Sequence, residues 1–210
     1  MIIDFSTLPA LQVYQSMTQT IIPRPIAWVL TDNGIDGAAK ENAFNLAPFS
    51  YFTAVSSDPA LVMLSVGKKS DGELKDTRRN IIERKHCVIH IAHDSQGEAL
   101  NASAATLAHG DSEIEKIGIA LETVEGWSLP RVKDCPVAMY CTLYDIQEIG
   151  PNKQGLLFCE VKALYVDDKA VTYDSKQRMK FDAQVISPLS RLGASDYASF
   201  GEVFSLARPN

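Results

Sequence analysis

The feature that most constrains the fold is a pair of long strand-like segments in the second half of the 210-residue chain. Residues 137–146 are rich in apolar and aromatic side chains, and residues 156–166 alternate between two faces. One face of the second segment carries Leu157, Cys159, Val161, Ala163 and Tyr165. This period of two indicates β-strands. The turn sequence Gly150-Pro151-Asn152 between the segments predicts that they form an antiparallel hairpin.

Three shorter apolar segments also predict strands, at residues 26–30, 61–66 and 87–92. The chain contains no internal repeat and no polar linker, so we expect residues 1–210 to form a single domain. Many strands with a few short helices indicate a mainly β fold, in which a closed or nearly closed β-barrel carries its helices on the outside.

Three helices are expected from their end signals. The first runs from Asp76 or Thr77 to about Arg84, with Ile81 and Ile82 facing inward. The second begins at a Ser-x-x-Glu capping box, Ser95 with Glu98, and reaches about Ala108. The third is short: it begins at a second box, Ser112 with Glu115, and ends at Gly118.

The composition excludes several classes of protein. Hydrophobic residues make up 46% and charged residues 22%, as in ordinary globular domains. A net charge of -6 argues against a nucleic-acid partner, which usually meets a basic face. No apolar run approaches the about 20 residues that span a bilayer. The first residues lack the basic segment of a signal peptide. A cytoplasmic location is therefore expected.

Cysteines and histidines give no metal or disulfide pattern. The four cysteines form no Cys-x-x-Cys pair and lie mostly in strand-like runs, which favours buried free thiols over disulfides. His86 and His90 on one strand would be about 13 Å apart, too far to share an ion. Glycine-rich nucleotide motifs and the Gly-x-Ser-x-Gly elbow are absent from the sequence.

The first of three informative segments combines Lys75, Asp76 and Thr77 at a predicted helix start with Asn80 one turn later. A phosphate needs positive charge, hydroxyl donors and free backbone N–H groups, and a helix start supplies the last of these. Ser65 and Gly67 precede this segment at the end of a strand. The alternative is that Asp76 or Thr77 only caps the helix and that Lys75 is solvated.

The second segment, residues 42–52, mixes small residues, amides and aromatics, as a backbone that passes close to a flat ligand would. The side chains of Asn45 and Ser50 are possible donors, and the N–H groups near Leu46 and Ala47 are suited to carbonyl oxygens on a ring. The alternative is an aromatic-rich barrel strand that bends at Pro48.

The third segment, residues 22–28, holds Arg24 between Pro23 and Pro25. The two prolines fix the chain there in an extended conformation. An arginine held in this way suits anion recognition or stacking on a ring. The alternative is a surface salt bridge.

In this order the segments resemble one family. Pro-Arg-Pro-Ile-Ala-Trp, Asn-Leu-Ala-Pro-Phe-Ser-Tyr-Phe, Ser-Asp-Pro-Ala and Lys-Asp-Thr-x-x-Asn-Ile are similar to segments of the flavin reductase-like and flavoredoxin group. The tail from Ile186 to Gly193, followed by Asp196-Tyr197, is similar too. The resemblance implies a split β-barrel related to pyridoxamine-phosphate oxidase barrels. It also implies non-covalently bound FMN, usually near the interface of a homodimer.

The resemblance also implies positions for the cofactor. The flavin and its ribityl chain would lie near Asn45, Leu46, Ala47 and Ser50. The phosphate would lie near Lys75, Asp76, Thr77 and Asn80, with Ser65 and Gly67 close by. Secondary candidates are Arg24 and Arg191.

One departure from the family bears on the electron donor. A Gly-Asp-His motif accompanies nicotinamide use in the short-chain reductases, whereas residues 108–111 here read Ala-His-Gly-Asp. The chain therefore resembles the flavoredoxin-like branch more closely, and direct use of NADH or NADPH is not implied.

Three functions follow as hypotheses. The first is an FMN-dependent oxidoreductase in which the flavin carries the chemistry and no side chain is a catalytic acid or base. The second is an electron carrier that docks with a protein redox partner. The third is a module that only binds or senses flavin.

Overall fold

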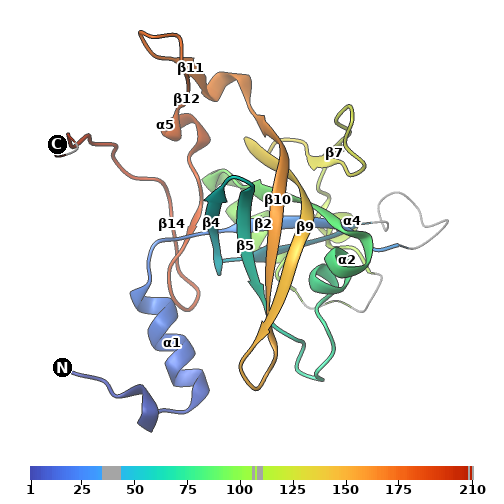
Figure 1. The fold of residues 1–210 in the computed structure, drawn as a ribbon, viewed down its shortest axis with the longest axis vertical. Helices are drawn as coiled ribbons and strands as arrows, with labels where there is room; N and C mark the ends of the chain where they lie inside the picture. Colours follow the sequence, from blue (N-terminus) through green and yellow to red (C-terminus); the bar gives the residue numbers. More distant parts are fainter. Residues whose placement is uncertain (35–43, 106, 108–110, 208, 210) are drawn as a thin grey trace.

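The computed structural model describes residues 1–34, 44–105, 107, 111–207 and 209. Its centre is one antiparallel sheet with the strand order β3-β2-β6-β9-β10-β5-β4 (Figure 1). The bounds of these strands are β2 Ala27–Asp32, β3 Phe44–Phe49, β4 Phe52–Ser57, β5 Ala60–Val66, β6 His86–Ile91, β9 Val137–Ile149 and β10 Gln154–Val166.

The sheet curls into a split barrel because of how its two edge strands are connected. β3 and β4 lie at opposite edges, yet only Ser50 and Tyr51 separate them along the chain. So short a connection brings the two edges together. The Ser65 N–H donates to the Tyr51 carbonyl over 2.9 Å and ties this corner to β5. Because β3 and β4 are not neighbours in the strand order, the barrel stays split, and the expected fold class is confirmed.

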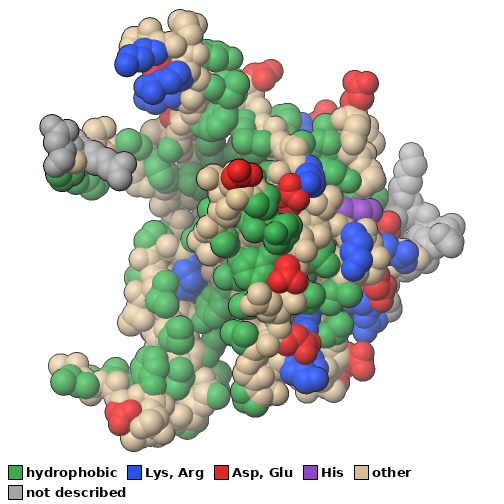
Figure 2. Space-filling view, in the orientation of Figure 1, with side chains coloured by type: hydrophobic (Ala, Val, Ile, Leu, Met, Phe, Trp, Pro, Cys, Tyr) green, Lys and Arg blue, Asp and Glu red, His purple; other side chains and the backbone are tan. Residues whose placement is uncertain are grey.

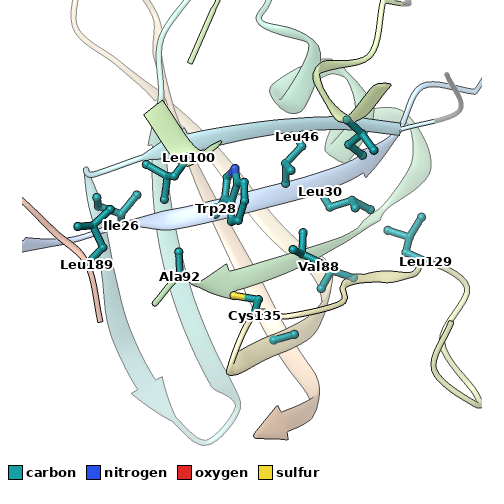
Figure 3. Packing of buried hydrophobic residues seen from close by; sticks show 13 residues of the cluster. Ile26, Trp28, Leu30, Leu46, Val88, Ala92, Leu100, Leu129, Cys135 and Leu189 are labelled. Atoms are coloured by element: carbon teal, nitrogen blue, oxygen red, sulfur yellow. The ribbon is translucent and has the colours of Figure 1, made fainter. Parts of the chain in front are cut away.

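Two apolar clusters cover the two faces of the sheet. Ala27 and Val29 of β2 pack in the barrel interior with side chains from β5, β6, β9 and β10. Trp28 and Leu30 point to the outer face, where α3 (Gly97–Ala102), α4 (Glu113–Ile117) and the segment 119–135 cover them (Figure 3). The Trp28 indole donates to the Ser103 hydroxyl over 2.8 Å, which satisfies its buried N–H.

All five expected strands are present, and β9 and β10 form the expected hairpin, paired from Gln154 opposite Ile149 to Val166 opposite Val137 with two register shifts between these ends. The prediction that Tyr165 shares the face of Leu157 was wrong. The register shifts between Val161 and Ala163, and an extra residue in one strand reverses the side on which later side chains lie. Tyr165 therefore packs against the outer cluster, whereas Leu157 lies inside the barrel.

The first expected helix is confirmed as α2, Asp76–Arg84. The helix expected from Ser95 was wrong in both bounds. A 3-10 turn, η2 (Asp94–Gln96), starts after His93, whose ring accepts from the Ser95 N–H, and α3 then ends at Ala102. The Ser103 hydroxyl donates back to the Leu100 carbonyl. Such a bond competes with further helix. Residues 106 and 108 of the expected range lie outside the described residues.

The short helix α4 begins after Ser112 and ends at Gly118, whose positive φ of 75° suits glycine, as predicted. Its capping box does not form, because the Ser112 hydroxyl donates to the Phe44 carbonyl over 2.7 Å instead.

Peripheral elements surround the barrel. They are η1 Phe5–Thr7, α1 Ala10–Thr20, β1 Arg24–Pro25, β7 Leu121–Glu122, β8 Arg131–Val132, η3 Asp168–Ala170, β11 Val171–Tyr173, β12 Met179–Phe181, α5 Ala183–Ile186, β13 Ser190–Arg191 and β14 Tyr197–Ala198. The N-terminal segment with α1 and the C-terminal segment both extend away from the barrel (Figure 1). In the described part of the chain, no helix combines the length and apolar character needed to cross a bilayer.

Candidate functional site

A cavity of about 360 Å³ lies where the start of α2 meets the edge strand β3. The connection between β5 and α2, the residues after α3 and the start of α4 complete its wall. Five of the residues expected near a flavin line it: Asn45, Ala47, Lys75, Asp76 and Thr77. The fold thus brings together two sequence segments that are about 30 residues apart, at one end of the barrel.

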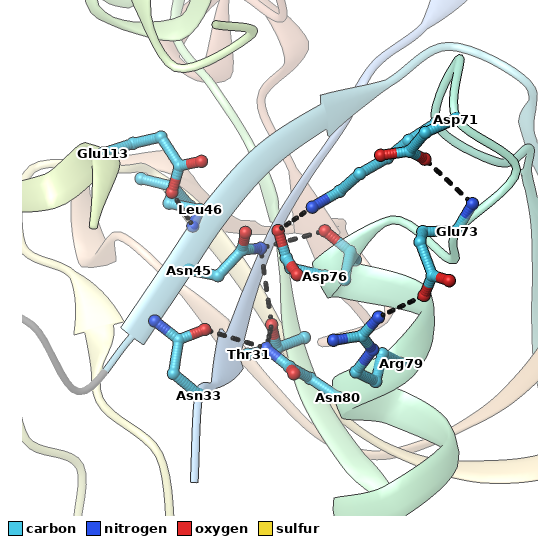
Figure 4. Close-up of polar contacts among 12 residues, drawn as sticks. Thr31, Asn33, Asn45, Leu46, Asp71, Glu73, Asp76, Arg79, Asn80 and Glu113 are labelled. Carbon is cyan, nitrogen blue, oxygen red and sulfur yellow. Dashed lines mark hydrogen bonds and ion pairs between the residues drawn. The ribbon is translucent and has the colours of Figure 1, made fainter. Parts of the chain in front are cut away.

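A buried hydrogen-bond network fixes α2 against β2 and β3 at this point. Asn45 Nδ2 donates to Thr77 Oγ1 over 2.9 Å and to Thr31 Oγ1 over 3.4 Å. One turn further along α2, Asn80 Nδ2 donates to Thr31 Oγ1 and to Asn33 Oδ1, each over 3.0 Å (Figure 4). Asn80 therefore positions the helix and does not line the cavity.

Positive charge gathers at the α2 end of the cavity, where Lys68, Lys69 and Lys75 all line it. Lys75 is the N-cap residue of α2, and no side chain caps this helix end. The sequence alternative in which Asp76 or Thr77 serves as the cap is therefore wrong. Three ammonium groups and a helix N-terminus together favour an anion at this end.

Two contacts hold the cavity's charged side chains in place. Lys69 Nζ pairs with Asp76 Oδ2 over 2.9 Å. Lys75 Nζ lies 5.8 Å from the centroid of the Phe49 ring. Asp76 thus offsets part of the lysine charge, and Lys75 stands beside the aromatic wall of the cavity.

The opposite wall contains a buried carboxyl group that the sequence analysis missed. Glu113 Oε2 accepts from the Leu46 N–H over 3.0 Å. Burial raises the pKa of Glu113, the Leu46 hydrogen bond opposes that shift, and the charge of Asp76 raises the pKa further. The Leu46 N–H, expected to face a ligand, is therefore occupied by a side chain 67 residues away, and the Leu46 side chain packs in the outer cluster. No local pattern signals this contact.

Two candidate residues lie in a second, smaller cavity of about 190 Å³, which Ser50 and Arg191 line together with Tyr197. The Arg191 guanidinium lies 4.3 Å above the Tyr197 ring. Pro48 lines both this cavity and the larger one. The two spaces are therefore adjacent at the end of β3.

Arg24 lies in neither cavity. Its buried guanidinium donates to the carbonyls of Thr18, Ile21 and Leu192 and to the Ser50 hydroxyl. With its N–H groups used in this way, the side chain ties α1 to the C-terminal segment and is not a surface salt bridge.

Ser65 and Gly67 lie at the end of β5, beside the turn between β9 and β10. Ser65 Oγ accepts from Gln154 Nε2 over 3.0 Å. A Cβ at Gly67 would lie 3.0 Å from Oε1 of Gln154, at the end of that flexible side chain. Gly67 borders a third cavity, between this strand end and the turn.

His90 and the four cysteines belong to the core. His90 is fully buried: Nδ1 donates to the Trp28 carbonyl over 2.9 Å, and Nε2 accepts from the Val132 N–H over 2.9 Å. Burial lowers the pKa of His90 to about 4, and with both nitrogens occupied it is no metal ligand. All four cysteines are buried and free, as predicted. Of the Ala-His-Gly-Asp segment, residues 108–110 lie outside the described residues.

Comparisons with known proteins identify the family. The sequence matches the flavin reductase like domain over residues 17–181, and the chain belongs to this family. Nitrilotriacetate monooxygenase component B from Bacillus cereus has a similar structure, with a TM-score of 0.85, 34% identity and 98% of each chain covered. The structure of the 2-nitrobenzoate 2-nitroreductase NbaA of Pseudomonas fluorescens is also similar, with a TM-score of 0.84 and 27% identity. The match covers 100% of this chain and 96% of the NbaA chain.

A flavoredoxin of Desulfovibrio vulgaris (Miyazaki F) shares the fold at lower similarity. Its TM-score is 0.69 at 18% identity, covering 89% of this chain and 91% of its own.

We predict that Glu113→Gln removes a pH-dependent loss of stability. Burial raises the pKa of the folded carboxyl, so it holds its proton to a higher pH than the unfolded chain, which ionises near the ordinary pKa of 4.5. Well below pH 4.5 Glu113 is protonated in both the folded and the unfolded chain, and its ionisation does not change the free energy of unfolding. As the pH rises from 4.5 towards the raised pKa of the folded state, Glu113 lowers the free energy of unfolding increasingly. The new amide oxygen still accepts from Leu46. Urea unfolding at about pH 4 and about pH 8 should show the variant gaining stability relative to wild type at the higher pH.

The exposed Glu115 of the same helix provides the control, because Glu115→Gln should show no such trend. A stability difference between Glu113→Gln and wild type that is the same at both pH values would contradict the raised pKa of the buried carboxyl.

Proposed function

We propose that the chain is a single-domain FMN-dependent oxidoreductase whose flavin binds in the cavity between β3 and α2. The observation that carries this proposal is the polarity of the cavity. Lys68, Lys69, Lys75 and the α2 N-terminus give the cavity a cationic lining, and Asn45 with the apolar residues Ala47 and Phe49 lines it beside them. A phosphate on a flat, partly apolar ring system fits this combination.

Different residues bind the phosphate and the ring of FMN. Lys75 and the first turn of α2 bind the phosphate, with Lys69 beside them. Asn45 and the end of β3 orient the ring. Bound flavin supplies hydride or electron transfer, and the protein supplies binding, orientation and hydrogen bonds. No side chain is assigned as a catalytic acid or base.

We favour a reductase that takes electrons from NADH or NADPH over an electron carrier. The relatives at 34% and 27% identity are a monooxygenase component and a nitroreductase by name, whereas the flavoredoxin likeness at 18% concerns the fold alone. One observation favours the electron carrier, which would exchange electrons with a protein redox partner. Residues 108–111 read Ala-His-Gly-Asp, an order that differs from the Gly-Asp-His motif tied to nicotinamide use.

An absorbance spectrum of the purified protein with added FMN tests the function. We expect the bands of bound oxidised flavin, which bleach on anaerobic addition of NADH or NADPH. Bands that persist with both nucleotides but bleach with a protein donor would replace the reductase with the carrier. A protein that binds no FMN would refute both.

The phosphate assignment predicts that Lys75→Gln weakens FMN binding about tenfold, because a charge-assisted contact to the phosphate is lost. Riboflavin, which lacks the phosphate, should bind both proteins equally, as measured by fluorescence titration. Arg79→Gln removes a charge from the same helix outside the cavity and should change neither affinity. Thr77 is a poorer target, because its loss would leave the buried Asn45 donor short of a partner. Equal losses for FMN and riboflavin would overturn the assignment.

We further propose a homodimer, supported by the exposed apolar side chains of both terminal segments. The N-terminal segment exposes Ile2, Leu11 and Tyr14, and the C-terminal segment exposes Phe204 and Leu206. Figure 2 shows apolar side chains on both of these segments. Apolar surface of this extent usually marks an interaction site. Sedimentation at micromolar concentration should give twice the mass of 23.0 kDa. A monomer under these conditions would contradict the proposal.

A further inference from the structure

We propose that the second cavity, which Ser50 and Arg191 line, binds a small aromatic carboxylate beside the flavin. The inference rests on the proposed flavin function and deepens it, because it names the class of substrate. The volume of this cavity is about 190 Å³. An apolar cavity of about 150 Å³ is large enough for benzene, so this one suits a single aromatic ring with a small substituent, and not a nucleotide.

The positive charge in the wall of this cavity comes from Arg191. None of the described residues that line the cavity is acidic. A guanidinium has five N–H groups, and Nη2 of Arg191 donates one of them to the Ala194 carbonyl. In the described part of the chain the others donate to no acceptor, so a pair of parallel N–H groups remains for a ligand. Such a pair matches the two oxygens of a carboxylate.

Neighbouring residues hold this guanidinium in place. Arg191 belongs to β13, which pairs Arg191 with Arg24 of β1 on one side and with Tyr197 of β14 on the other. The guanidinium lies 4.3 Å from the centroid of the Tyr197 ring, and the Tyr197 hydroxyl donates to Asn101 Oδ1 of α3 over 3.0 Å. An arginine that is already positioned loses less side-chain entropy when it binds a ligand.

Ser50 adds a hydroxyl donor and a second source of positive charge behind it. Ser50 Oγ accepts from Nε of the buried Arg24 over 3.4 Å, so the hydroxyl keeps its own proton for another acceptor. In the described part of the chain Arg24 donates to carbonyl and hydroxyl oxygens and pairs with no carboxylate. Its charge therefore adds to that of Arg191 and favours an anion in this cavity.

Apolar side chains form most of the remaining wall and suit an aromatic ring. The buried residues Ile26 and Leu100 line the cavity together with Pro48 and the ring of Tyr14. Pro48 and Ala104 also line the flavin cavity. A ring in the second cavity therefore adjoins the space proposed for the flavin, where a substrate of the flavin has to lie.

The test measures binding of benzoate and of benzamide, which has the same ring but no charge, by isothermal titration calorimetry with and without FMN. We expect wild type to bind benzoate about tenfold more tightly than benzamide, because only benzoate gains the charge-assisted contact. Benzoate affinity should fall about tenfold in Arg191→Gln, and less in Arg191→Lys, which keeps the charge but loses the planar N–H pair. FMN affinity should stay within about twofold in both variants. Arg178→Gln, at an exposed arginine outside the cavity, should change neither affinity.

Each other outcome has a distinct meaning. Equal affinities of wild type for benzoate and benzamide would overturn the carboxylate site, and this comparison needs no variant to fold. Unchanged benzoate affinity in Arg191→Gln would overturn the site too, while the flavin function stands. An equal loss of benzoate and FMN affinity in this variant would assign Arg191 to the flavin and also overturn the proposal. Wild type that prefers benzoate but binds no FMN would support the carboxylate site and refute the proposed flavin function.

Discussion

The site depends on one buried contact, the hydrogen bond from Asn45 of β3 to Thr77 of α2. A buried amide or hydroxyl without a partner costs about 1–3 kcal/mol. Asn45, Thr31 and Asn80 satisfy one another only when α2 sits at one height and one rotation against the sheet. The network thereby places the first turn of the helix beside the edge of β3. The position of the cavity, and of the lysines around it, follows from this constraint.

The lysines around this cavity are positive, whereas the net charge of the chain is negative. The net charge of -6 repels anions, but salt largely screens exposed charges that lie more than about 8–10 Å from the anion. Inside that range, an anion at the start of α2 meets Lys68, Lys69 and Lys75. Asp76 compensates one of these lysines and holds it in a fixed position. The positive charge is therefore a local property of the cavity, and it is compatible with a net charge that argues against a nucleic-acid partner.

The sequence predicted what depends on local patterns. Alternation located the hairpin of β9 and β10, the end signals located α2, and the ordered motifs identified the family. The bulge that turns Tyr165 to the other face has no such pattern. The same is true of the end of α3, where the Ser103 hydroxyl competes with the helix.

Contacts between residues far apart in the sequence explain why the observed site differs from the predicted one. Arg24 was a candidate for an anion, but its donors meet carbonyls of Thr18 and, 168 residues away, Leu192. Proline-fixed backbone indicates where the residue sits and not which atoms surround it. Glu113 was missed for the same reason, because only the folded chain brings it to Leu46.

The edge of β3 sets a condition on any flat ligand beside it. In an antiparallel strand, alternate N–H groups point away from the paired neighbour. Because Leu46 donates to Glu113, its N–H belongs to this outward set, and the next outward position is Pro48, which has no N–H. A ring carbonyl that binds Leu46 must therefore displace the Glu113 oxygen. Burial favours the protonated carboxyl, a weaker acceptor that gives up this N–H more readily than a carboxylate does. Glu113 thus covers the outward N–H group of Leu46, and protonation of the carboxyl makes this cover easier for a ligand to replace.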